Sequence, residues 1–274
     1  MFDTVIEMLS YPFMTRAFLV GSLVALCSAL LGVSLVLKRY SMIGDGLSHL
    51  GFGAMAIAAA MNAAPLTVAI PVVIVAAILL LRISGNAKIK GDAAIALIST
   101  TSLAVGVMVI SLTTGMNTDV YNYMFGSILA MSAEDVKLSL VLSVCVLILF
   151  IVFYHKIFAI TFDETFARAT GVKAGVYNTL IAVLTAVTIV LGMRMMGALL
   201  ISSLIIFPAL TSMRVCRTFK SVIINAAVIS VVCLIAGVTL SYVAATPAGA
   251  SVVLANLVMM VLYTVVGAVK NHMR

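Results

Sequence analysis

The sequence has little charge. Charged residues occupy only 9% of the 274 positions, tryptophan is absent, and 64% of the residues are hydrophobic. A soluble chain carries charge at roughly a quarter of its positions, because charged side chains cover its surface. A soluble globular fold is therefore excluded, and we expect an integral membrane protein.

Several motifs of catalysis and cofactor binding are missing as well. The sequence has no GxxxxGK[ST] phosphate loop, no HExxH motif and no nucleophile elbow. Its four cysteines are isolated, without the CxxC spacing of zinc or redox sites. We therefore expect a protein that is not an enzyme, binds no resident cofactor and obtains any ATP-derived energy from another subunit.

Long apolar runs are what the sequence does contain. Most are long enough to cross a bilayer as a helix, which takes about 20 residues, and no alternating strand pattern appears. We predict an all-α fold, a polytopic transmembrane helical bundle of eight or nine spans that forms one domain over 1–274. The stretch 175–213 is the less certain part of this count, because its two runs are short. The runs are 15–37, 42–62, 64–82, 92–113, 136–154, 175–193, 195–213, 221–243 and 248–269.

Basic residues follow every odd-numbered run, whereas acidic residues gather on the other side. Short loops rich in lysine and arginine remain in the cytoplasm. Nine spans would then place the N-terminus outside the cell membrane and the C-terminus inside. The net charge of +7 is explained by this topology, so we infer no nucleic-acid surface from it. The basic residues include Lys38, Arg39, Arg82, Lys156, Arg168, Lys173, Arg214, Arg217 and Lys220.

Asp45 and His49 stand out in the run 42–62. Asp45 is the acidic residue predicted to lie within a span and away from its ends, and His49 is the histidine so placed. An aspartate at mid-helix costs about 2.5 to 3.5 kcal/mol on insertion scales, so such residues are usually functional. Residues four apart share a helix face, where a carboxylate and an imidazole can bind one divalent cation.

Two other interpretations of this pair stay open. Asp45 and His49 could hydrogen-bond each other, or Asp45 could pair with Arg39 near the membrane surface. The sequence offers no obvious third buried ligand, so a second copy of the chain or water would complete a metal site. Methionines also invite a copper(I) path, since Met193, Met195 and Met196 cluster. Methionine is, however, an ordinary filler of apolar packing, which we favour here.

The segment "LKRYSMIGDGLSH" resembles the permease subunits of ATP-binding-cassette (ABC) importers for manganese, zinc and iron. Four further segments match the same family in order, so the similarity spans nearly the whole chain. The resemblance implies that Asp45 and His49 belong to a metal site in the translocation path, with Mn²⁺, Zn²⁺ and Fe²⁺ all compatible. The further segments are "YNYMFGSILAMSAEDV", "FDETFARATGV", "GALLISSLIIFPAL" and "SYVAATPAGASVVL".

The resemblance also assigns two other regions. The segment 162–172 corresponds to the cytoplasmic coupling helix that docks on the ATPase, with an ordinary solvated loop as the alternative. Its expected coupling residues are Asp163, Glu164, Ala167, Arg168 and Gly171.

A proline inside a transmembrane helix is a second implied feature. Pro208 removes a backbone N–H and frees a carbonyl, and Ser202 and Ser203 could hydrogen-bond that backbone or a passing hydrated ion. A plain kink is the alternative. Thr246 occupies a place near Pro247 where many relatives have an acidic residue, which weakens any ligand assignment there.

The expected partners follow from the same resemblance. They are a second copy of the chain, two cytoplasmic ATPase subunits, an extracellular metal-binding protein and the lipid bilayer. Two alternatives remain at this point: a permease for a metal chelate such as a siderophore or cobalamin, and an ATP-independent metal carrier.

Overall fold

The structure, a computed structural model, describes residues 10–84, 91–113 and 133–272, and every regular element in these ranges is an α-helix. This confirms the predicted all-α class. In chain order the helices are α2 (Pro12–Leu37), α3 (Ile43–Ala60), α4 (Pro65–Ser84), α5 (Gly91–Thr113), α7 (Ala133–Val152), α8 (Tyr154–Phe162), α9 (Glu164–Ala169), α10 (Ala174–Met196), α11 (Ala198–Val215), α12 (Phe219–Ala244) and α13 (Ala248–His272).

Residues that favour helix N-termini stand at several of these starts. Pro12 is the first residue of α2, where its missing N–H costs nothing. Asp163 caps α9 by accepting a hydrogen bond from the Phe166 amide. Thr218 and Ser221 form a capping box that begins α12. Local sequence therefore defines where these helices begin.

The predicted count of eight or nine spans is higher than the number of helices that are long and apolar enough to cross a membrane. Seven helices among the described residues meet both criteria. The runs 42–62 and 195–213 do form helices, α3 and α11. The polar pair and the glycines of α3 lower its hydropathy, and the apolar segment Leu200–Val215 of α11 is short. The seven are α2, α4, α5, α7, α10, α12 and α13.

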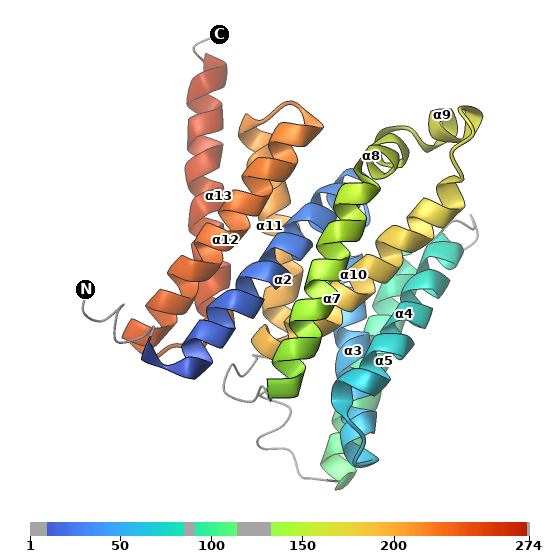
Figure 1. The fold of residues 1–274 in the computed structure, drawn as a ribbon, viewed down its shortest axis with the longest axis vertical. Coiled ribbons are helices and arrows are strands. Elements are labelled where there is room, and N and C mark those ends of the chain that lie inside the picture. Colours follow the sequence, from blue (N-terminus) through green and yellow to red (C-terminus); the bar gives the residue numbers. More distant parts are fainter. Residues whose placement is uncertain (1–9, 85–90, 114–132, 273–274) are drawn as a thin grey trace.

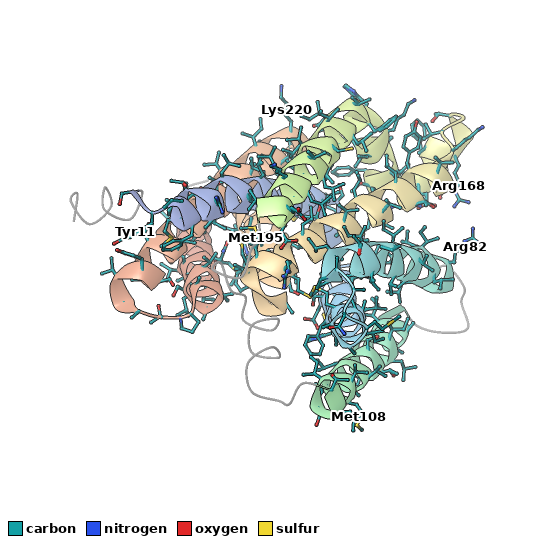
Figure 2. The ribbon with its side chains drawn as sticks, turned by 60° about the horizontal axis from the view of Figure 1, so that its bottom comes forward. Tyr11, Arg82, Met108, Arg168, Met195 and Lys220 are labelled. Atoms are coloured by element: carbon teal, nitrogen blue, oxygen red, sulfur yellow. The ribbon has the colours of Figure 1, made fainter. Side chains whose placement is uncertain are left out.

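The long helices run alternately up and down the bundle, so that α2 begins and α13 ends at opposite ends (Figure 1). The short helices α8 and α9 lie at the end where α2, α4 and α7 finish, which we call the α9 end. Figure 2 shows Arg82, Arg168 and Lys220 at the periphery of the molecule, while Met195 lies among the helices.

Glycine and methionine together determine how closely the central helices approach. A Cβ at Gly32 of α2 would lie 2.1 Å from the Ile205 carbonyl oxygen of α11, so these backbones are in contact. The Met196 side chain lies over Gly21, and that of Met193 lies over Gly51. These methionines are 0 to 3% exposed. Their burial supports packing as the role of the methionine cluster.

Helices α10 and α11 are joined by a single residue. Gly197 has a φ of 86°, a conformation that side chains other than glycine rarely adopt. The last turn of α10 also carries Arg194, whose guanidinium lies 3.7 Å from the Asp135 carboxylate of α7. The uncertain stretch 175–213 is thus two distinct helices, the first of which is tied to α7.

Candidate functional site

Asp45 and His49 lie on successive turns at the start of α3. Asp45 is in the first turn, so the expectation that it lies away from the helix ends is wrong. A carboxylate at this position interacts favourably with the positive end of the helix dipole, by about 0.3 to 1 kcal/mol. The dipole therefore offsets part of the cost of placing this charge among apolar residues.

The two side chains face each other without a close contact. His49 Nε2 lies 3.7 Å from Asp45 Oδ2, longer than a hydrogen bond, and the side chains are 22% and 47% exposed, respectively. Arg39, in the turn before α3, forms no ion pair with Asp45 among the described residues. The carboxylate and the imidazole therefore keep lone pairs that a cation could use.

Helix α11 adds a third polar group. The Ser202 hydroxyl oxygen lies 3.5 Å from Asp45 Oδ1 and 3.4 Å from the Ala198 carbonyl oxygen, and its single proton can be donated to either. Ser203 instead donates to the Leu200 carbonyl at 2.8 Å and is buried. Of the three pathway residues predicted on α11, the structure brings Ser202 to Asp45. Pro208 lies further along the helix.

Small residues allow α3 to lie this close to its neighbours. A Cβ at Gly46 would lie 2.5 Å from the Ile95 side chain of α5, and one at Gly44 would lie 3.1 Å from that of Ile205 on α11. Glycine at position 46 lets α3 approach α5, and glycine at position 44 lets the start of α3 lie against α11, where Ser202 reaches Asp45. The glycines around the pair are therefore part of its geometry.

The ligand set within one chain is incomplete. Among the described residues, no three histidine, cysteine or acidic side chains gather closely enough to hold a metal ion. Divalent cations take four to eight ligands, so Asp45, His49 and Ser202 would bind one only with added water or groups from another chain.

The segment 162–172 contains the short helix α9 at the end of the bundle. Asp163 accepts a hydrogen bond from the Phe166 amide at 2.8 Å and thereby caps the helix. Ala167 is the buried residue of the helix, and Gly171 follows with a φ of 84°. The segment is thus a structured helical turn, as the resemblance implies. Its contact with an ATPase remains a prediction.

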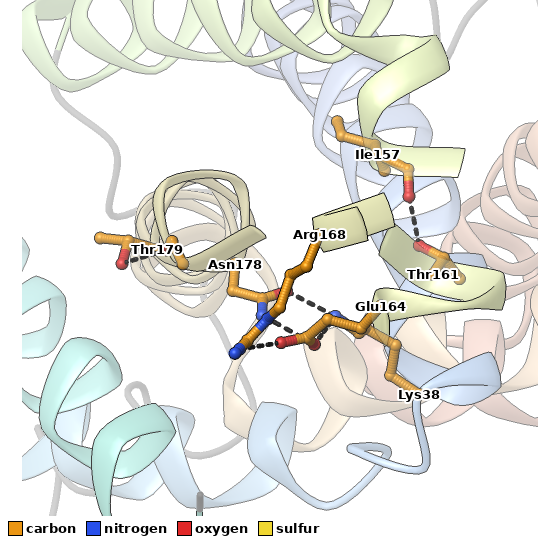
Figure 3. A network of polar contacts seen from close by, with 8 residues as sticks. Lys38, Ile157, Thr161, Glu164, Arg168, Asn178 and Thr179 are labelled. Atoms are coloured by element: carbon orange, nitrogen blue, oxygen red, sulfur yellow. Dashed lines mark hydrogen bonds and ion pairs between the residues drawn. The ribbon is translucent and has the colours of Figure 1, made fainter. Parts of the chain in front are cut away.

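Glu164 is the centre of a polar network that fastens α9 to the bundle (Figure 3). Its carboxylate accepts hydrogen bonds from Arg168 at 2.6 Å, from Asn178 of α10 at 3.0 Å and from Lys38 at 3.4 Å. Lys38 Nζ also donates to the Asn178 side-chain oxygen. One carboxylate therefore joins α9, α10 and the end of α2.

The network perturbs both of its ionisable partners. Burial by itself would raise the pKa of Glu164, but the hydrogen bonds from Asn178 and Arg168 and the charge of Lys38 hold that pKa below its ordinary value. Burial lowers the pKa of Lys38, and the Glu164 carboxylate acts in the opposite direction. The ion pair is thus favoured by partners on three helices.

Lys38 and Asn178 were absent from the predicted site residues. From sequence alone, Lys38 is predicted only as one of the basic residues that set the topology, and nothing singles out Asn178. The two contacts to Glu164 cross 126 and 14 residues, respectively. No local spacing connects Lys38 with Glu164. The general signal is that a lysine at the end of a helix can pair with an acidic residue in a loop that faces it.

Comparison with known proteins identifies the family. Residues 10–267 match the ABC 3 transport family. The chain belongs to this family. Among its relatives are the manganese transport system membrane protein MntC of Halalkalibacterium halodurans (27% identical, covering 90% of this chain and 85% of that one) and the high-affinity zinc uptake system membrane protein ZnuB of Haemophilus influenzae (30%, covering 90% and 94%).

A solved structure supports the same assignment. PsaBC from Streptococcus pneumoniae, in complex with Fab, matches with a TM-score of 0.86 and 26% identity over 95% of this chain and 94% of that one. As an ABC 3 family member, the chain is a multi-pass membrane permease, a transport component rather than an enzyme. The resemblance stated from the sequence is thereby confirmed.

Proposed function

We propose that this permease carries a divalent transition-metal ion, Mn²⁺, Zn²⁺ or Fe²⁺, into the cell, and that Asp45 and His49 bind the ion on its way. The observation that carries the proposal is the meeting of a carboxylate, an imidazole and the Ser202 hydroxyl between α3 and α11. Carboxylate oxygen attracts hard dications, and imidazole favours transition metals over magnesium and calcium. The relatives named for manganese and zinc systems support this substrate class.

The pathway is formed by two copies of the chain. Asp45 is 47% exposed in the single protomer, so its carboxylate is accessible to groups of a second protomer. A second Asp45–His49 pair, or water, would complete the coordination that one protomer leaves unfinished. Metal bound between two protomers would then move as they tilt against each other.

The basic α9 end faces the cytoplasm, by the positive-inside rule. Two ATPase subunits dock there on α9, and an extracellular binding protein delivers the ion at the opposite end. ATP binding and hydrolysis would alternate the access of the site between the two sides. The N-terminus of the chain is then outside and the C-terminus inside.

The test is ATP-dependent metal uptake by the reconstituted complex of permease, ATPase and binding protein. Vesicles are offered Mn²⁺, Zn²⁺ and Fe²⁺ separately, and their metal content is measured by elemental analysis. We expect accumulation of at least one ion that stops without ATP. Accumulation of a labelled siderophore or cobalamin but of no free ion would replace the proposal with chelate transport. Accumulation that continues without ATP would replace it with a carrier.

A further inference from the structure

The short helix α9 depends on polar contacts to hold its place on the bundle. It has six residues, and Ala167 is its buried residue, so apolar burial anchors it weakly. The contacts of Glu164 with Lys38 and Asn178 supply the remaining attachment. A displacement of α9 must therefore either break these contacts or move the helices at their other ends.

Lys38 is the partner of Glu164 for which loss of the ion pair is most unfavourable. Its side chain is only 11% exposed, whereas that of Arg168, which contacts the same carboxylate, is 65% exposed. Separating Lys38 from Glu164 would leave a largely buried ammonium without its counter-charge, which is strongly unfavourable. Arg168 lies on α9 itself, so it moves together with Glu164 and does not tie α9 to the bundle. The Lys38 contact thus follows the carboxylate when α9 moves.

A tight turn connects Lys38 to the candidate metal ligand. Lys38 is the C-cap of α2, and Asp45 stands in the first turn of α3, seven positions later. The turn between them is held by backbone hydrogen bonds from Tyr40 to Leu35 at 2.8 Å and from Ile43 to Tyr40 at 3.0 Å. Because the turn is short and hydrogen-bonded, we expect a displacement of Lys38 to move Asp45 as well.

The second contact of Glu164, with Asn178, connects it to the other helix of the same site, α11. Asn178 lies near the start of α10, and α10 passes through Gly197 directly into α11, which carries Ser202. Ser202 and Asp45 meet at 3.5 Å. Both helices that bear the site are therefore preceded by a helix that Glu164 contacts.

From this arrangement we infer that the Lys38–Glu164 ion pair is the contact through which movement of α9 repositions Asp45, so that Lys38 is a positioning residue that couples ATP hydrolysis to release of the ion. The inference rests on the proposed function, since it presumes ATP-driven metal transport. It adds a residue and a route that lie outside the metal pair and the docking helix.

The experiment measures metal transported per ATP hydrolysed in the reconstituted complex, for Lys38→Met, Glu164→Gln and the double variant. We expect this ratio to fall at least ten-fold in each, while metal binding to the permease stays within two-fold of wild type. In Lys38→Met, whose lysine lies outside the docking helix, basal ATP hydrolysis should also stay within two-fold. The double variant should be no worse than the single ones, because both remove one contact. Lys38→Arg, which keeps charge and donors, should retain coupling.

Lys220→Met is the matched control. It removes an exposed lysine at the same end of the molecule, outside the Glu164 network, and should leave the ratio unchanged. An unchanged ratio in Lys38→Met would overturn the inference, and so would transport and hydrolysis that fall together, which is the signature of lost folding or assembly. Failure of the wild-type complex to move any divalent metal would instead refute the proposed function.

Discussion

Asp45 and His49 offer a cation two ligands of different hardness on one helix face. The carboxylate supplies charge, and the imidazole supplies selectivity for transition metals. Asp45→Asn keeps the shape of the side chain and removes the charge, and His49→Gln removes the imidazole. We expect each change to reduce metal uptake at least ten-fold while ATPase association persists, as measured by elemental analysis and co-purification. Ser203→Ala, beside Ser202 but bonded to its own helix, is the control and should transport normally.

Glu164 provides a prediction about pH. Its folded pKa is lowered, so its contribution to stability is complete above the ordinary carboxyl value of 4.5 and is lost as the pH falls through the folded pKa. Glu164→Gln should therefore lower Tm by about 2 °C at pH 7, in keeping with a partly exposed ion pair. Once the pH has fallen well below the folded pKa, the wild type and the variant should melt together. A difference in Tm that persists in acid would show that charge is not its cause.

The residues of the site differ in how far the sequence could predict them. Asp45 and His49 were found from their spacing, because four positions along a helix define a shared face. The contact of Ser202 with Asp45 crosses 157 residues, so it depends on how α3 and α11 pack. The same holds for Lys38, whose partner lies 126 residues away. Spacing within one helix predicts neighbours, whereas contacts between helices require the fold.

At the scale of elements, α9 ends in a conformation that only glycine adopts easily. Gly171 has a φ of 84° and no atoms near its added Cβ, so Gly171→Ala would strain the backbone without a steric clash. We expect a cost of about 1 kcal/mol and a displaced α9. The result should be less metal transported per ATP, with binding at Asp45 unaffected.

Gly175 gives this prediction a matched control. It also has open space around an added Cβ, but its φ is not positive, and it lies in the first turn of α10. Gly175→Ala should leave the transport ratio at the wild-type value. If both alanine variants behave alike, the turn after α9 has no special part in coupling.

For the whole molecule, apolar runs predicted the helices but not how many meet the usual criteria for a span. The sequence predicts a span at the run containing Asp45, yet α3, which carries the polar pair and several glycines, is not among the seven helices that meet the criteria. Helices that line a polar path need not look like lipid-facing spans, because their partners are other helices. Composition alone is thus least reliable for recognising the helices that line a functional path as membrane spans.

The orientation of the chain follows from the same charges and can be measured on α12. This helix has 26 residues, about 39 Å of length, and Figure 1 shows it running from the end that carries α9 to the opposite end. Arg217 precedes the helix and Ala244 ends it, and both are exposed. In a cysteine-free background, Ala244→Cys should react with a membrane-impermeant maleimide on intact spheroplasts. Arg217→Cys should react only after permeabilisation, because the basic end faces the cytoplasm. The reverse pattern would invert the topology and place α9 beyond the reach of a cytoplasmic ATPase.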